Sequence, residues 1–377
     1  MIKHKAYKFR VYPTKEQEEY FAKCFGCVRF IYNKMLADKI DYYNQTKQTL
    51  NNTPAQYKEE FPWLKEVDSL ALANSQLQLR TAYSNFFRDT KIGFPKFKSK
   101  KRDNNSYTTN NQANLIEIFD SDRYIKLPKV KRLRIKCHRK VTEHIKSVTI
   151  TKEPTQKYYI SLLVEYEKEQ PNPNLSLENG IGLDYSSPHF YVDNQGNKGE
   201  YPKFYRQAQD KLAREQKKLS NMKYGSNNYA KQKIKVAKIH EHIANQRKDW
   251  LHKLSTRLAN NYDYIFVEDL KMDAISKLLH LGKATSDNGF GIFRNYLKYK
   301  TEERGKLFVK IDKWFPSSKK CSFCGEINSG LTLQDREWTC SSCGKHHMRD
   351  INAAINIYNE GIKQITVGTA GVSLSIL

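Results

Sequence analysis

Residues 315–325 read FPSSKKCSFCG, and residues 340–354 read CSSCGKHHMRDINAA. Each stretch holds a Cys-x2-Cys pair followed directly by glycine, and fifteen residues separate the two pairs. Two such turns can place four thiolates around one ion, which favours a single structural zinc with no open ligand position. An iron site and four unligated buried cysteines are the less favoured interpretations. The predicted zinc ligands are Cys321, Cys324, Cys340 and Cys343.

Three acidic residues stand where elements are expected to begin or end. Asp184 ends an apolar strand, Glu268 ends a second one, and Asp350 opens a helix directly after the cysteine segment. Two Mg²⁺ ions that hydrolyse a phosphodiester need hard oxygen ligands of this kind. Each acid alone is more typical of a helix cap or an ion pair, so the prediction of a catalytic site depends on their meeting at one sheet edge.

The charge balance points to a polyanionic partner. The chain has 377 residues, with 65 Lys and Arg against 40 Asp and Glu, which gives a formal net charge of +25. Nucleic acid is the favoured partner, and an anionic membrane surface is the alternative. No stretch approaches the roughly 20 consecutive apolar residues of a membrane span. Residues 1–10 lack the apolar core of a secretory signal, so we expect a cytoplasmic protein.

Two basic stretches are the predicted nucleic-acid contacts. The first is a loop in which Phe94 and Phe97, followed by Tyr107, interleave with cations, as expected for phosphate binding combined with base stacking. The second alternates over 131–137, with a cationic face opposite an apolar face. The predicted binding residues are Lys96, Lys98, Lys100, Lys101, Arg102, Lys131, Arg132, Arg134 and Lys136.

The stretch PNPN at 171–174 is typical of a linker, so we expect a domain boundary there. The first part is expected to be a strand, helices and then an antiparallel sheet. The second part is expected to be short strands around a long helical hairpin over 203–260. The further predicted segments are strands 3–12, 147–151, 158–165, 264–267 and 307–311, and helices 69–87 and 350–358. Cys24 and Cys27 lie in a helical pattern without a second pair, which favours helix packing over metal binding.

Further motifs accompany these features. They are YKFRVYPT at 7–14, GCVRFIYN at 26–33, FPKFKS at 94–99, LPK at 127–129, FPSSKKCSFCG at 315–325 and RDINAA at 349–354. On these motifs the chain resembles the TnpB (OrfB) family, transposon-encoded proteins related to type V CRISPR effector nucleases. The resemblance covers nearly the whole chain. After Asp184 it departs from the family, because YSSP at 185–188 replaces a turn that more often contains glycine.

The resemblance implies an α+β and α/β architecture in four parts. A β-barrel-like wedge domain (an oligonucleotide-binding fold) would cover 1–13 and 91–172, with a helical recognition insertion at 14–90. An RNase H-like (RuvC) nuclease domain would cover 176–312 and 346–377, with a zinc ribbon inserted at 313–345.

The resemblance also implies a function and partners. A guide RNA from the transposon end would direct DNA cleavage beside a short adjacent motif, with Asp184, Glu268 and Asp350 holding two Mg²⁺. Arg349 and Asn352 border the last acid. Two roles are open for them: they position phosphate or metal, or they cap the helix. In a prokaryotic cytoplasm the protein would join the nucleoid when bound to DNA.

The alternatives are a nuclease-silent RNA-guided repressor, an accessory transposase protein without cleavage activity, and a basic zinc-ribbon RNA-binding protein. A transposase that performs strand transfer by itself is disfavoured, because the chain lacks a recognisable His-hydrophobic-His site. The sequence does not distinguish a monomer from a dimer.

Overall fold

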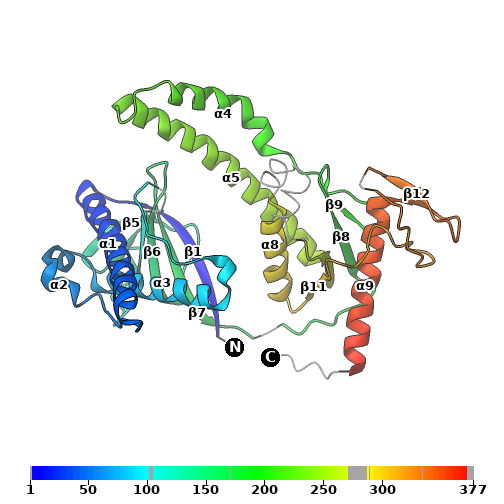
Figure 1. Cartoon of the computed structure of the whole chain (residues 1–377), viewed down its shortest axis with the longest axis horizontal. Helices are drawn as coiled ribbons and strands as arrows, with labels where there is room; N and C mark the ends of the chain where they lie inside the picture. The colour runs from blue at the N-terminus through cyan, green and yellow to red at the C-terminus, as the bar shows by residue number, and fades with distance from the viewer. Residues whose placement is uncertain are drawn as a thin grey trace. The chain divides into compact units, whose positions relative to one another are not determined.

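The computed structural model of the chain describes residues 2–101, 105–169, 171–270, 287, 289–332 and 334–371. The chain divides into two compact units, residues 1–168 (unit 1) and 169–377 (unit 2). Each unit has its own hydrophobic core. Figure 1 traces the elements of both units in chain order.

Unit 1 is built around a seven-stranded antiparallel sheet with the order β2-β6-β7-β1-β5-β4-β3. The strands are β1 (Ile2–Tyr12), β2 (Asn105–Asn110), β3 (Glu117–Phe119), β4 (Tyr124–Leu127), β5 (Val130–Lys136), β6 (His144–Lys152) and β7 (Tyr158–Glu167). The first strand of the chain lies inside the sheet, because β7 and β5 pair with its two sides. Within the described residues no ladder joins β2 to β3, so the sheet is open at these edges.

Two helices of unit 1 pack on one face of this sheet, α1 (Lys15–Thr46) and α3 (Ser69–Arg88), as Figure 1 shows. The shorter helices of the unit are α2 (Tyr57–Glu60), η1 (Pro62–Glu66) and η2 (Thr90–Ile92). Thr14 and Gln17 form the capping box that starts α1. Phe21 packs its ring against Tyr107 and Tyr158 of the sheet. Apolar residues at helical spacing thus join α1 to the sheet in one core.

Two sequence predictions in this unit have clear outcomes. Cys24 and Cys27 are buried in α1 as packing residues, and the cysteine cluster found among the described residues includes neither. The expectation that Tyr107 stacks on a base is wrong, because its side chain is 3% exposed and lies under α1. Phe94 and Phe97 are exposed, as a stacking role requires.

Unit 2 contains a four-stranded sheet with the order β11-β10-β8-β9 and a two-stranded sheet in the cysteine segment. Its elements are β8 (Gly180–Ser186), β9 (Phe190–Asp193), α4 (Phe204–Ser220), α5 (Asn227–Asn261), β10 (Tyr264–Glu268), α8 (Phe290–Glu302), β11 (Leu307–Ile311), β12 (Glu337–Thr339), β13 (His346–Met348) and α9 (Arg349–Gly371). The strands β8, β10 and β11 are parallel, and β9 is antiparallel to β8. The predicted helical hairpin is α4 and α5.

Helices cover both faces of the four-stranded sheet. On β10, Ile265 and Val267 face a core shared with α5 and α8, whereas Tyr264 and Phe266 face a core shared with α9. A strand buried on both faces is continuously apolar, which explains the run over 264–267. The helix α9 extends beyond the predicted end at residue 358, because Ile362 and Ile365 continue its apolar stripe.

The absence of a side chain at Gly182 lets α9 approach β8. A Cβ atom at this position would lie 2.4 Å from the carbonyl oxygen of Ala354 and 2.8 Å from the amide nitrogen of Tyr358. Both atoms belong to the helix backbone, so no side-chain rotation could relieve the contact. This close approach brings the first turn of α9 towards the end of β8.

No helix in the described part of the chain is long and apolar enough to span a membrane.

Candidate functional site

Three carboxylates meet at one edge of the sheet of unit 2. Asp184 lies near the end of β8, Glu268 is the last residue of β10, and Asp350 lies in the first turn of α9. Because Leu183 and Val267 pair in parallel register, Asp184 and Glu268 follow them at the same edge. All three side chains are partly buried. The structure therefore brings together three acids that are more than 80 residues apart in sequence.

Burial and neighbouring charges shift the pKa values of the two acids at the strand ends. Burial raises the pKa of Asp184 well above its ordinary value, and the negative charges of Glu268 and Asp350 raise it further. Burial also raises the pKa of Glu268. Of the nearby cations, Arg349 opposes the shift at Asp184. Carboxylate oxygens are hard ligands of the kind that Mg²⁺ prefers, so Asp184, Glu268 and Asp350 are the residues that could hold it.

Two serine hydroxyls donate hydrogen bonds to these acids. Ser186 Oγ lies 3.2 Å from Asp350 Oδ2. Ser317 Oγ donates to Glu268 Oε1, and this hydrogen bond lowers the pKa of Glu268 against the effect of burial. Each hydroxyl fixes the direction in which one carboxylate points. Neither serine was predicted from the sequence to be a site residue.

A partly buried arginine holds the end of β10. Arg294 of α8 donates to the carbonyl oxygens of Glu268 at 2.9 Å and Leu270 at 2.7 Å, and pairs with Asp269 at 3.5 Å. The backbone at Glu268 and directly after it is therefore held by one side chain. This residue too was absent from the sequence predictions.

The two neighbours of Asp350 named from the sequence have different surroundings. Arg349 Nε lies 3.7 Å from Asp350 Oδ1, and its Nη1 donates to the carbonyl oxygens of Thr332 and Asp335. The side chain of Asn352 is 1% exposed and is bonded to the backbone of the first cysteine turn. Arg349 thus reaches the carboxylate cluster, whereas Asn352 connects α9 to the cysteine segment.

The four predicted zinc ligands converge. Their sulfur atoms all lie within 4.8 Å of one another, with 3.7 Å between Cys321 and Cys343 and 3.6 Å between Cys324 and Cys340. A tetrahedron with Zn–S bonds of about 2.3 Å has edges of about 3.8 Å, so the arrangement fits zinc. At the turns, the amides of Gly325 and of Gly344 donate to the first cysteine of each pair. Both glycines have positive φ, which explains why glycine follows each pair.

A histidine extends the cysteine cluster on its buried side. His347 Nε2 lies 3.0 Å from Cys321 Sγ, and its ring packs on Trp338 with 4.8 Å between centroids. The donor set that the structure presents to a metal remains the four thiols.

In unit 1 the predicted basic strand has the expected two faces. Leu133 and Ile135 are buried, whereas the four cations of β5 are exposed. Those cations are Lys131, Arg132, Arg134 and Lys136. In the loop before β2, Lys96, Lys100 and Lys101 are exposed. Arg102 lies outside the described residues.

Aromatic rings separate the cations of the exposed sheet face. Tyr12 lies between Arg10 at 5.4 Å and Arg134 at 5.6 Å, and Tyr159 lies between Lys8 at 4.5 Å and Arg10 at 5.2 Å. We call these five residues the cation–aromatic ladder. Of these five residues only Arg134 was predicted from the sequence to bind nucleic acid, although Lys8, Arg10 and Tyr12 alternate with buried residues of β1.

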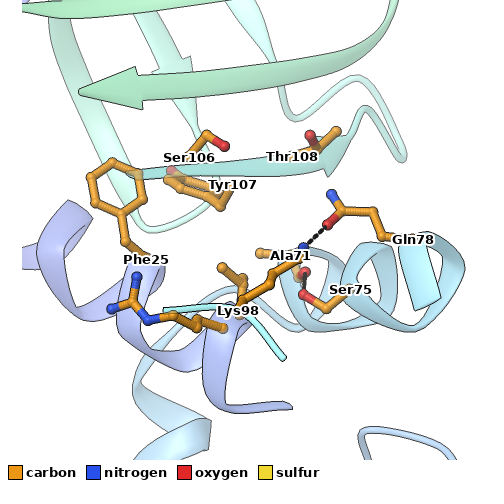
Figure 2. Close-up of a pocket in the computed structure, with 10 residues that line it drawn as sticks. Phe25, Ala71, Ser75, Gln78, Lys98, Ser106, Tyr107 and Thr108 are labelled. Atoms are coloured by element: carbon orange, nitrogen blue, oxygen red, sulfur yellow. Dashed lines mark hydrogen bonds between the residues drawn. The ribbon is translucent and has the colours of Figure 1, made fainter. Parts of the chain in front are cut away.

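A cavity of about 180 Å³ lies where α1, α3 and β2 meet. Figure 2 shows Phe25 and Tyr107 beside it, and the Lys98 side chain reaching Gln78. Lys98 Nζ donates to Gln78 Oε1 at 2.7 Å and lies 4.1 Å from the Tyr32 ring. Arg29 contributes a second cation. Lys98, which was predicted to bind nucleic acid, is therefore half-buried and hydrogen-bonded within unit 1.

Comparison with known proteins gives these sites a context. A family model described as "Probable transposase" matches residues 161–279, and a model described as "Cas12f1-like, TNB domain" matches residues 290–357. A protein of Streptomyces pristinaespiralis named "Putative RNA-guided DNA endonuclease" is 34% identical over 97% of this chain and 91% of its own. The chain is a member of the TnpB (OrfB) family. A relative of this TnpB-family protein with the same designation, InsQ of Escherichia coli (strain K12), is 30% identical over 98% of the chain and 95% of its own.

A solved structure supports the fold of this TnpB-family protein as mixed α/β. Cas12f1, determined in complex with a single guide RNA and target DNA, aligns with 95% of this chain and 99% of its own, with a TM-score of 0.60 and 13% sequence identity. A third family model, described as a helix-turn-helix domain, matches residues 1–48. In the structure this range is the strand β1 and the single long helix α1. The helix-turn-helix description therefore does not fit the N-terminal region of this TnpB-family protein.

Proposed function

We propose that this protein is an RNA-guided DNA endonuclease of a transposable element, which cuts beside a short adjacent motif. The observation that carries the proposal is the convergence of Asp184, Glu268 and Asp350 from two parallel strands and a helix. The names of the relatives from Streptomyces and Escherichia support the same activity. The proposed nuclease domain is of the RuvC type, an RNase H-like sheet with its acids at the strand ends.

In the proposed mechanism the three acids hold two Mg²⁺ ions. Magnesium bound there would activate a water and stabilise charge on the attacking and leaving oxygens of the phosphodiester. The protein contributes the fixed positions of the carboxylates. Ser186 and Ser317 orient two of them, and Arg294 holds the strand end beneath Glu268. Arg349 places a positive charge beside Asp350, where it can contact the scissile phosphate.

The four thiolates are proposed to hold one structural zinc ion. Cys321, Cys324, Cys340 and Cys343 leave no position for a substrate, so this metal would fold the segment between β11 and α9 and take no part in the chemistry.

Unit 1 supplies the surfaces proposed to bind nucleic acid. The cation–aromatic ladder and the exposed cations of β5 offer phosphate contacts and aromatic faces on one sheet surface. Guide RNA from the transposon end and target DNA are the proposed partners, and base pairing between them would choose the sequence. The protein then needs only to grip the backbones with its excess of positive charge.

The proposal is tested by expressing the protein together with its native flanking DNA and sequencing the RNA that copurifies. The ribonucleoprotein is then given Mg²⁺ and a plasmid library with the guide match beside randomised flanks. We expect a discrete RNA, and cleavage confined to plasmids that share one short flanking motif.

The other outcomes separate the alternatives. A discrete RNA with guided binding and no cleavage would support a repressor or an accessory transposase protein. No discrete RNA would leave a basic zinc protein that binds RNA, and would overturn the proposal.

A further inference from the structure

The loop between β11 and the first cysteine turn touches the proposed catalytic site. Ser317 lies in this loop, is 6% exposed, and donates its hydroxyl hydrogen to Glu268 Oε1 across 49 positions of sequence. The loop belongs to the segment that leads into Cys321. One short piece of chain therefore contacts both the carboxylate site and the cysteine cluster.

Two buried asparagines clasp this loop onto α9. Asn356 Nδ2 donates to the carbonyl oxygens of Ser317 at 2.8 Å and Lys320 at 2.6 Å. Asn352 Nδ2 donates to the same Lys320 oxygen at 2.8 Å, and Asn352 Oδ1 accepts from the amide of Ser322 at 2.9 Å. Asn352 is 1% exposed and Asn356 is 3% exposed. Since they stand four residues apart, they present one face of the helix to the loop.

The hydrogen bonds define a continuous path. Ser322 lies between Cys321 and Cys324, so the hydrogen bond to Asn352 is made by the first cysteine turn itself. Asn356 donates to the carbonyl oxygen of Ser317, and the hydroxyl of Ser317 donates to Glu268. The clasping helix also carries Asp350 in its first turn. A change in the structure of the cysteine turn would therefore shift Glu268, one of the proposed magnesium ligands.

We propose that Ser317 is a positioning residue for Glu268, and that the zinc-bound cysteine turn is the brace that keeps Ser317 in place. The inference rests on the proposed nuclease function and adds a role for the zinc segment in shaping the carboxylate site. A hydrogen bond from an outer residue fixes the orientation of a metal-binding carboxylate, and its loss typically weakens metal binding or activity by about 10–100-fold.

The first test measures Mn²⁺ binding to the full-length ribonucleoprotein through the electron paramagnetic resonance signal of the free ion. The Asp184→Asn variant serves as the blank for other binding sites. We expect Ser317→Ala to weaken the Asp184-dependent site about tenfold while bound zinc stays at the wild-type level. Ser317→Thr keeps the hydroxyl and should restore binding. Ser318→Ala is the matched control, since no hydrogen bond from the Ser318 hydroxyl is found among the described residues, and it should change nothing.

The second test removes zinc with a chelator and repeats the Mn²⁺ titration. Zinc depletion should weaken the site in the wild type by a factor similar to that of Ser317→Ala. In Ser317→Ala, zinc depletion should weaken Mn²⁺ binding by less than about a further twofold, because the hydrogen bond from Ser317 to Glu268 is already lost. A Ser317→Ala variant that binds Mn²⁺ as tightly as the wild type would overturn the positioning role. Equal weakening of wild type and variant on zinc removal would overturn the brace.

Failure of the proposed function gives a different result. If the wild type shows no Mn²⁺ binding that depends on Asp184, the carboxylate site itself is wrong and the inference falls with it. If the wild type binds Mn²⁺ and the serine variants do not differ from it, the carboxylate site stands and only the inference fails.

Discussion

Replacement of Gly182 by alanine tests how β8 and α9 are joined. The new Cβ would lie 2.4 Å from the carbonyl oxygen of Ala354 and 2.8 Å from the amide nitrogen of Tyr358. Since non-bonded carbon contacts are relaxed near 3.5 Å, helix and strand must separate by about 1 Å. Overpacking of this kind costs about 1–3 kcal/mol. In a domain the size of unit 2, each kcal/mol lowers the melting temperature by roughly 2–4 °C, so about 2 kcal/mol predicts a loss of about 4–8 °C.

The same displacement should reach the carboxylates. Asp184 follows Gly182 by two residues on β8, and Asp350 lies one turn before Ala354 on α9. A misplacement of about 1 Å between catalytic groups can cost about 100-fold in rate. We therefore expect Gly182→Ala to cut DNA about 100-fold more slowly in single-turnover assays. Hydrogen exchange should also show faster opening of β8 and α9.

A matched control is available in α1. A Cβ at Gly26 would meet no atom within 4 Å, and the residue lies in a regular helix. Gly26→Ala should raise the stability of unit 1 by about 1 kcal/mol, because alanine favours the helix over glycine. Calorimetry of the full-length protein measures both variants. If Gly182→Ala melts within 1 °C of the wild type and cuts at the wild-type rate, the close packing of α9 on β8 is wrong.

Three further changes have defined outcomes. Cys324→Ser should lower bound zinc and speed hydrogen exchange over 321–348, because three thiolates bind zinc more weakly than four; unchanged zinc content would contradict the metal centre. Burial lowers the pKa of Lys300 from 10.5 to about 8. Between these pH values the unfolded chain binds one more proton than the folded chain, so the free energy of unfolding of unit 2 rises from pH 8 towards pH 10. Lys300→Met should remove this rise, and an identical dependence of melting temperature on pH in both proteins would refute it. Replacing Arg134 and Lys136 with glutamine should reduce the slope of log affinity for RNA against log salt by about 0.7–0.9 per lost phosphate contact, whereas an unchanged slope would show that these cations make no such contact.

Short-range patterns allowed much of the fold to be predicted from sequence. The period-two alternation on β5 correctly placed Leu133 and Ile135 inside and the cations outside. The glycines after each cysteine pair, at 325 and 344, predicted turns that the structure contains. Such features depend on neighbours in the chain, which is why a single sequence reveals them.

Contacts between distant residues could not be predicted in the same way. Ser317 meets Glu268 across 49 positions through an irregular loop, and no periodicity indicates that contact. Tyr107 stands among polar residues and near the basic loop, yet it is buried because α1 packs over β2. Ser186 is an intermediate case, since it follows Asp184 by two residues on one strand and so shares its face.

A comparison of the wild type with Asp350→Asn tests the proposed nuclease site most directly. Both ribonucleoproteins are incubated with a guide-matched plasmid, and binding and Mg²⁺-dependent cleavage are measured side by side. We expect equal binding and at least about 100-fold slower cleavage by the variant, because the amide removes one negative charge from the proposed metal ligands. Cleavage by Asp350→Asn at the wild-type rate would contradict the central claim that these three carboxylates form the nuclease site.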